Sequence, residues 1–311
     1  RSVRLEAGTA SHTGRIRTSN QDSVGLADGL YLVADGMGGH RGGEVASAEA
    51  VAAILGVFNR RDRAGLVDAV RSANRAILEK TVTRPDLSGM GTTLCALAVV
   101  NSASGDQVLA VANIGDSRVY RFVAGELVQV SNDHSLVADL MRAGELSAEE
   151  AARHPQRNIL TRALGIEADP VIDSWELEPA LGDRYLLCSD GLFNELDDGR
   201  LAELLAIGSV QETADRLVDE AVENGGHDNV TVLVVEVVAG PEPRDDRRAA
   251  VPAARSERST QTRGAADEGR VAFGTALGMA ACVVATLVLV LGLYARQGWF
   301  IGSDEGDVAV F

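Results

Sequence analysis

The chain has 311 residues, of which 46% are hydrophobic, and a formal net charge of −16. Nearly all of the excess negative charge falls on residues 1–239, which argues against nucleic acid as a partner because phosphate backbones attract basic surfaces. Three cysteines, Cys95, Cys188 and Cys282, lie in apolar stretches without a pairing pattern, so we expect no disulfide.

The pattern of apolar residues predicts an α+β fold. Short apolar runs bounded by Gly, Asp or Asn predict strands at about 3–12, 23–34, 91–100, 106–113, 117–123, 126–130, 170–177, 183–188 and 230–238. Helical spacing predicts helices over 43–58, 62–81, 197–206 and 209–223. Because several strands follow one another directly, we expect two antiparallel sheets with helices outside. Residues 132–165 are polar and helical only in short pieces, which indicates an inserted surface subdomain.

The C-terminal part of the sequence differs from the body. Residues 240–271 are rich in Pro, Arg and Ala without periodicity and are expected to form a flexible linker. Residues 272–294 carry no charge over a length sufficient to cross a bilayer, which predicts one transmembrane helix. Arg residues cluster before this span, so the positive-inside rule predicts a cell-membrane protein with a cytoplasmic body and an outer tail from 295 to 311.

Four carboxylates each stand where an apolar run meets a tight turn: Asp35, Asp116, Asp190 and Asp228. Each alone would be an ordinary turn residue. Ionised carboxylates are costly near a core unless they are paired or bind metal, so the four together predict one shared cation site. Ligand sets of carboxylate oxygen without Cys favour Mg²⁺ or Mn²⁺ over Zn²⁺. Two such ions would activate a water for attack on a phosphate ester.

Two more residues in the segment RTSNQD extend this predicted site. Asp22 adds a fifth carboxylate, and Arg17 has the planar fork that binds two phosphate oxygens. His227 adjoins Asp228, but neighbouring positions on a strand face opposite sides, so we expect it at the surface or in a supporting role.

Six ordered motifs, RTSNQD, VADGMGG, GMGTT, NIGDSR, CSDGL and HDNVT, resemble those of the bacterial metal-dependent Ser/Thr protein phosphatases (PPM family, type 2C). The resemblance covers about residues 3–238. It implies a four-layer α-β-β-α sandwich and hydrolysis of phosphoserine and phosphothreonine in proteins. The domain, linker and single span also resemble membrane-anchored actinobacterial members, which implies kinases and kinase substrates as partners.

The resemblance assigns roles to individual residues. It implies that Asp35 bridges two Mn²⁺ or Mg²⁺ ions, that Asp190 and Asp228 complete the first site, and that the Gly36 carbonyl ligates the second ion. Asp22 would act on the second ion through water.

Four further features take expected roles from the same resemblance. Asp116, with Asp190, would hold a third and weaker ion. Arg17 would bind the phosphate, so that Arg17, Asp35 and Asp190 form the expected catalytic set. Ser117 and a mobile flap over 132–165 would shape the access of substrate.

The general acid is left open by the sequence, since Met37 stands where eukaryotic relatives have a His. His40, His154 and a water are the candidates. Two other classes of function compete with the enzyme: a tethered regulatory module without turnover, which usually loses one of the acids or the Arg, and a sensor that signals through its outer tail.

Overall fold

The computed structural model describes residues 2–38, 41–243, 251–252, 254–257, 301–304 and 307–310. The chain divides into two compact units, Arg1–Ser259 and Thr260–Phe311. In the second unit, the strands β13 (Ile301–Asp304) and β14 (Asp307–Val310) form an antiparallel hairpin. The predicted transmembrane segment, 272–294, lies outside the described residues, and no helix in the described ranges is long and apolar enough to cross a membrane.

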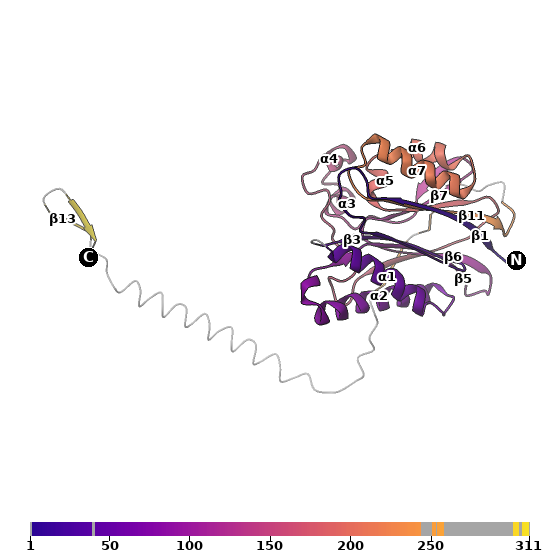
Figure 1. The fold of residues 1–311 in the computed structure, drawn as a ribbon, viewed down its shortest axis with the longest axis horizontal. Coiled ribbons are helices and arrows are strands. Elements are labelled where there is room, and N and C mark those ends of the chain that lie inside the picture. Colours follow the sequence, from indigo (N-terminus) through magenta and orange to yellow (C-terminus); the bar gives the residue numbers. More distant parts are fainter. Residues whose placement is uncertain are drawn as a thin grey trace, which may run out of the picture. The chain divides into compact units, whose positions relative to one another are not determined.

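Two antiparallel sheets lie face to face in the first unit (Figure 1). The five-stranded sheet has the order β1 (Arg4–His12), β11 (Val230–Ala239), β10 (Arg184–Cys188), β7 (Arg118–Val123), β8 (Glu126–Gln129). The seven-stranded sheet has the order β12 (Arg255–Glu257), β9 (Ile172–Leu177), β6 (Gln107–Ile114), β5 (Leu94–Asn101), β3 (Leu30–Met37), β2 (Asp22–Ala27), with β4 (Gly91–Thr92) paired to β3.

Helices cover the outer face of each sheet, which gives the four layers expected from the sequence (Figure 1). The seven-stranded sheet is covered by α1 (Gly42–Val57) and α2 (Arg63–Thr83), followed by a 3-10 turn, η1 (Pro85–Leu87). The five-stranded sheet is covered by α5 (Asp190–Phe193), α6 (Asp198–Leu205) and α7 (Val210–Asn224). The predicted insert over 132–165 contains two short helices, α3 (Leu136–Arg142) and α4 (Ala148–Ala152). The α+β prediction is therefore confirmed.

The side chains of each strand point alternately to the two faces of its sheet, and the two sheets therefore form three hydrophobic clusters. In β3, Leu32 packs under α1 and α2, whereas the next residue, Val33, packs between the sheets. In β10, Leu187 faces the space between the sheets and Leu186 faces α5, α6 and α7. Because successive side chains on a strand point to opposite faces, strands buried on both sides read as continuous apolar runs.

One predicted strand is in fact a hairpin. The run expected over 23–34 is divided into β2 and β3 by a turn at Asp28 and Gly29, where Gly29 has φ of +65°. Asp-Gly is a strong hairpin signal because the turn needs positive φ. The resulting register makes Asp22 the direct cross-strand partner of Asp35.

The structure also differs from the expected linker. Within 240–271, residues Arg255–Glu257 form β12, which pairs antiparallel with the edge of β9. Val251 and Ala254 pack against the cluster between the sheets. The segment therefore pairs with backbone groups that an edge strand would leave unpaired. This stabilising contact comes from the tertiary fold and is not predicted by the composition of the segment.

Candidate metal and phosphate site

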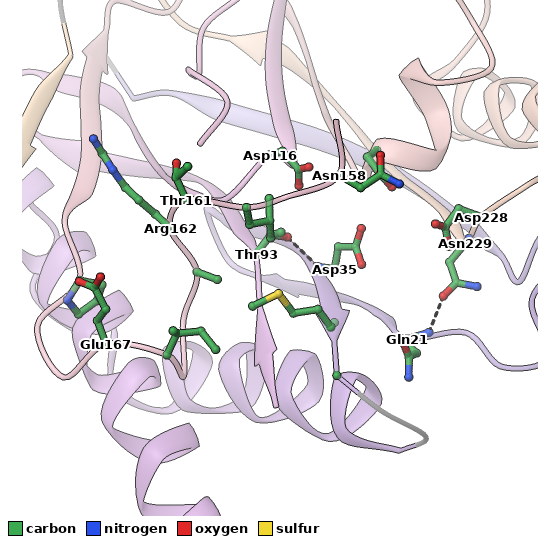
Figure 2. Close-up of a pocket in the computed structure, with 18 of the residues that line it drawn as sticks. Gln21, Asp35, Thr93, Asp116, Asn158, Thr161, Arg162, Glu167, Asp228 and Asn229 are labelled. Carbon is green, nitrogen blue, oxygen red and sulfur yellow. Dashed lines mark hydrogen bonds between the residues drawn. The ribbon is translucent and has the colours of Figure 1, made fainter. Parts of the chain in front are cut away.

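A cavity of about 600 Å³ opens where the predicted acidic residues meet (Figure 2). Its lining contains all but one of the residues predicted from the sequence as metal or phosphate ligands: Arg17, Asp35, Gly36, Asp116, Asp190 and Asp228. Residues at the end of the predicted flap and just after it complete the lining: Asn158, Leu160, Thr161, Arg162, Ala163, Ile166 and Glu167. The structure thus brings segments from the whole body of the chain to one site.

The ends of four strands position the four carboxylates. Asp35 lies near the end of β3, and Asp116 lies in the tight turn between β6 and β7, where Gly115 has φ of +101°. Asp190 begins α5 directly after β10, and Asp228 precedes β11. Because each Asp ends or begins a buried strand, its backbone is fixed while its carboxylate faces the cavity.

Burial and mutual repulsion act on these carboxylates. Burial, followed by the charges of Asp22, Asp190, Asp116 and Asp228, raises the pKa of Asp35 well above its ordinary value. Burial and then the charges of Asp116 and Asp228 raise the pKa of Asp190 to about 8. Such a cluster of half-buried acids disfavours its own ionised state and is suited to binding cations.

Asp22 lies behind this cluster and does not line the cavity. Its Oδ2 accepts a hydrogen bond from Ser189 Oγ at 2.8 Å. Its Oδ1 is buried, and no group in the described part of the chain donates a well-formed hydrogen bond to it. Burial is also the main cause that raises the pKa of Asp22 to about 6. An orphaned buried carboxylate oxygen next to Asp35 fits a hydrated cation in the cavity.

The donor set fits hard divalent cations, although the side chains are not arranged as a finished coordination shell. Across the described ranges, no three His, Cys, Asp or Glu side chains are close enough together to form a metal-binding group. Like charges separate carboxylates that share a site. The carboxylate oxygens are therefore suitable ligands for Mg²⁺ or Mn²⁺. Bound ions would draw the carboxylates to coordination distance.

Arg17 is paired with one of the predicted ligands. Its Nη2 lies 2.6 Å from Asp228 Oδ2, and the side chains are 54% and 32% exposed respectively. The amide N–H of Asn229 donates to Asp228 Oδ1 at 2.8 Å. Arg17 thus stands at the accessible side of the cavity, where its guanidinium has unburied donors for an incoming phosphate.

Threonines of the GMGTT motif hold the Asp35 backbone, a role that sequence reasoning missed. Thr93 Oγ1 accepts from Asp35 N at 3.0 Å and shares a 2.7 Å hydrogen bond with Ser117 Oγ. Thr92 Oγ1 donates to Asp35 O at 2.9 Å. Ser117 is fully buried, so the expectation that it shapes substrate access is wrong, and it supports the cavity floor instead.

Asn229 has a similar supporting role on the opposite side. Its Oδ1 accepts from Gln21 N at 2.8 Å (Figure 2), and its Nδ2 donates to the carbonyls of Thr13 and Ser19. It therefore fixes the segment that carries Arg17 and Asp22 to the strand that follows Asp228. The motif HDNVT contains this residue, but only the tertiary fold reveals its partners.

Close contact between two stretches of backbone explains why glycine is required at positions 36 and 43. Gly36 lies within VADGMGG, and Gly43 follows this segment. A Cβ on Gly36 would lie 2.0 Å from Gly43 O, and a Cβ on Gly43 would lie 2.6 Å from Gly36 O. No side chain fits between these backbones. The start of α1 is thus held directly against the predicted carbonyl ligand.

Of the histidines predicted as candidates from the sequence, the two that the structure describes do not line the cavity. His154 lies in the flap, does not line the cavity, and accepts a hydrogen bond from Gln156 N. His227 is exposed and its Nδ1 is 2.7 Å from Glu195 Oε1, which confirms the expected surface role. His40 lies outside the described residues. Met37 lines the cavity beside Asp35.

The comparison with known proteins gives a consistent result. The family model for protein phosphatase 2C matches residues 10–224. The serine/threonine protein phosphatase PstP of Mycobacterium tuberculosis is 42% identical over 239 residues, which are 75% of this chain and 45% of that protein. The chain thus spans about half the length of that relative. The serine/threonine phosphatase stp of Listeria monocytogenes is 38% identical over 246 residues, 75% of this chain and 96% of that protein.

Solved structures agree over the same region. The crystal structure of the Mycobacterium tuberculosis phosphatase PstP/Ppp has a TM-score of 0.69 at 42% identity and covers 76% of this chain and 99% of that one. A structure of the PstP catalytic domain in complex with two manganese ions has a TM-score of 0.68 at 40% identity and covers 76% and 100%. The two sheets, the motif order and these similarities lead to one conclusion: the chain belongs to the protein phosphatase 2C family, in its bacterial Ser/Thr phosphatase branch.

Proposed function

We propose that the chain hydrolyses phosphoserine and phosphothreonine in proteins and uses two Mn²⁺ or Mg²⁺ ions. The observation that carries this proposal is the convergence of four carboxylates and Arg17 on one cavity. The matching relative that holds two manganese ions supports the choice of metal. Asp35, Asp190, Asp228 and the Gly36 carbonyl would hold the two ions, with Asp22 behind them and Asp116 at a third position. When bound, such ions supply an activated water and neutralise the phosphoryl group.

The chain's own residues prepare the phosphate for attack. Arg17 would exchange its ion pair with Asp228 for a bidentate contact to the phosphate, which orients the phosphoryl group and neutralises part of its charge. Asn194 Nδ2 donates to Asp190 Oδ2 at 3.2 Å and fixes that carboxylate in its rotamer. Thr93 and Thr92 fix the backbone of Asp35. His154 does not line the cavity, so His40 and water are the candidates that would give the alkoxide leaving group its proton.

Phosphate release from a phosphothreonine peptide tests the activity. The full chain is assayed with Mn²⁺, with Mg²⁺ and with chelator, beside Arg17→Ala and the neighbouring exposed control Arg15→Ala. We expect metal-dependent turnover, a loss of about 10²-fold in kcat/KM for Arg17→Ala from the missing bidentate contact, and no change for Arg15→Ala. A folded chain without turnover in any metal would favour the regulatory module.

We further propose that residues 272–294 anchor the protein in the cell membrane with the phosphatase domain in the cytoplasm, where it opposes Ser/Thr kinases. The uncharged span and the Arg cluster before it support this placement. Membranes from cells that express the full chain provide the test. Retention after carbonate washing, together with protection of the domain from external protease in sealed spheroplasts, is expected. Release by carbonate would contradict the anchor.

A further inference from the structure

Strand β12 lies at the edge of the seven-stranded sheet next to β9, and the residues just before β9, Pro170 and Val171, line the cavity. It pairs with β9 so that Ser256 stands opposite Asp173. Ser256 Oγ donates to Asp173 Oδ1 at 2.6 Å, and Ser174 Oγ is 3.3 Å from the Arg255 carbonyl oxygen. The family match ends at residue 224, so these contacts come from a part of the chain that the family model does not describe.

Asp173 is the centre of a buried polar group. Besides Ser256, its Oδ1 accepts from Arg162 Nη1 at 3.2 Å, and its Oδ2 is 3.2 Å from His134 Nε2. Asp173 is 5% exposed. Burial would raise its pKa, but hydrogen bonds from His134 and Ser256 and the charge of Arg162 lower the pKa to about 2. The carboxylate is therefore an anion that needs these donors.

His134 joins this group to the turn that carries Asp116. The Gly115 N–H donates to His134 Nδ1 at 3.1 Å, and His134 N donates to Gly115 O at 2.9 Å. With Nδ1 as acceptor, the neutral imidazole carries its proton on Nε2 and donates to Asp173 Oδ2. The Asp173 Oδ2 atom is thus used by His134, and Oδ1 is shared by Ser256 and Arg162.

Arg162 belongs to the wall of the cavity. It lies opposite Asp228 across the cavity, with Asp35 and Thr93 between them (Figure 2), and its side chain is 35% exposed. One face of its guanidinium is held by Asp173, so the direction of the remaining donors depends on where Asp173 is held. Arg162 thus lines the same cavity as Asp35, on the side away from Asp228.

We infer that Ser256 is a positioning residue for substrate binding: through Asp173 it sets Arg162 to bind the carbonyl or carboxylate oxygens of the peptide flanking the phosphorylated residue. This inference rests on the proposed function. It connects the segment after the domain, through Asp173, to Arg162 in the wall of the cavity. A small substrate that needs only the metal site, such as an aryl phosphate, does not reach Arg162. Its hydrolysis therefore does not depend on Ser256.

Steady-state kinetics of the full chain test this inference with two substrates, a phosphothreonine peptide and para-nitrophenyl phosphate. Ser256→Ala is expected to raise KM for the peptide by about threefold to tenfold, the usual value of one hydrogen bond, with kcat changed less than twofold. Ser256→Thr keeps the hydroxyl and stays near the wild type. Ser256→Asp places a second carboxylate against Asp173 and has a larger effect. The aryl phosphate is expected to give the same kcat/KM in all variants.

Two controls separate positioning from general damage. Ser104→Ala removes a similar hydroxyl that donates to Asp106 Oδ2 at 2.8 Å on an exposed turn, and it should leave both substrates unchanged. In an Arg162→Ala background, Ser256→Ala should add no further loss, since the two residues act in series. A peptide KM unchanged by Ser256→Ala, or a parallel loss on both substrates, overturns the inference.

Failure of the proposed function gives a different result. If the wild-type chain hydrolyses neither substrate, the function is wrong, and the inference is decided by binding alone. The Kd of a fluorescent phosphothreonine peptide is then compared by anisotropy for the wild type and Ser256→Ala. Weaker binding by the variant supports the role of Ser256, and equal binding contradicts it.

Discussion

Asp22 and Asp35 are direct cross-strand partners in the hairpin of β2 and β3. Like charges that face each other across a strand pair destabilise a sheet. The fold nevertheless keeps both, and each has a raised pKa with burial as its main cause. The stability given up in the metal-free protein is regained when a cation binds, so metal affinity and fold stability are linked.

Asp190→Asn is expected to stabilise the metal-free protein while it removes the response to metal. The pKa of Asp190 is raised to about 8 in the fold, so its ionised form at pH 8 opposes folding. Replacing Asp190 by Asn should raise the free energy of unfolding by about 1 to 2 kcal/mol. This is less than the full pKa shift implies, because solvent relaxation screens the charge. The thermal midpoint in chelator at pH 8 measures this gain.

The same variant should show no rise in midpoint with Mn²⁺ and no turnover, whereas the exposed Glu223→Gln on α7 should behave as the wild type. A metal-free Asp190→Asn protein that is less stable than the wild type would contradict the repulsion that we assign to this cluster.

Stability of the metal-free protein should fall as the pH rises. The carboxyl groups of Asp22 and Asp190 have folded pKa values of about 6 and about 8, above the ordinary value near 4. Their contribution is complete below about pH 4 and is lost as the pH rises through these folded values. With Mn²⁺ bound this dependence should disappear, because the ions hold the carboxylates ionised.

Thermal midpoints between pH 5 and pH 8.5, in chelator and in Mn²⁺, measure the difference. Calorimetry of Mn²⁺ binding at pH 6.5 in two buffers with different ionisation enthalpies should detect released protons. A difference between loaded and chelated protein that does not change with pH would contradict the prediction.

The sequence predicts the parts of the site that depend on local pattern. Asp116, Asp190 and Asp228 were recognisable because each adjoins an apolar run at a turn. The pairing of Asp22 with Asp35 was not predicted, because the turn at Asp28 and Gly29 interrupts a run that is apolar on both sides. The strand β2 is only partly buried, and the Asp-Gly pair was the local signal from which the hairpin could have been predicted.

Residues that act through tertiary hydrogen bonds could not be predicted from local pattern. His134 and Thr93 are buried polar residues whose partners are far apart in the sequence. Strand β12 has only three residues and gains its stability from the edge of β9. Its sequence contains no strand signal strong enough to oppose the composition of a linker.

Thr93→Val should lower turnover more than it lowers stability. Val matches the shape of Thr but leaves the amide of Asp35 and the hydroxyl of Ser117 without their shared partner. An unsatisfied buried group costs about 1 to 3 kcal/mol, and the Asp35 backbone would move to recover the bond. We expect kcat to fall at least about tenfold, since small displacements of reacting groups are costly.

Thr93→Ser is the matched control, because it keeps the hydroxyl and loses only a methyl group. It should retain most of the activity and lose about 1 kcal/mol of stability. Equal activity of the Val and Ser variants would contradict the role of this hydroxyl. Phosphopeptide kinetics and thermal unfolding of both proteins provide the measurement.

Two alanine substitutions in helix α1 should have opposite effects. At Gly43 a new Cβ would lie 2.6 Å from the Gly36 carbonyl oxygen, whereas at Gly56 a Cβ has nothing within 4 Å. Gly56→Ala should stabilise the protein by about 0.5 to 1 kcal/mol through helix propensity. Gly43→Ala gains the same propensity but must push the Gly36 carbonyl away from the cavity, so we expect weaker Mn²⁺ binding and lower turnover.

Mn²⁺ titrations of the two variants, followed by calorimetry and by activity, separate the contact from the general effect of alanine in a helix. Backbone atoms cannot swing aside as a side chain can, so the clash at Gly43 has to move either the helix or the turn after Asp35. Both movements change the site, because the predicted carbonyl ligand lies at their contact. Unchanged Mn²⁺ affinity in Gly43→Ala, with the fold intact, would mean that the Gly36 carbonyl is not a ligand.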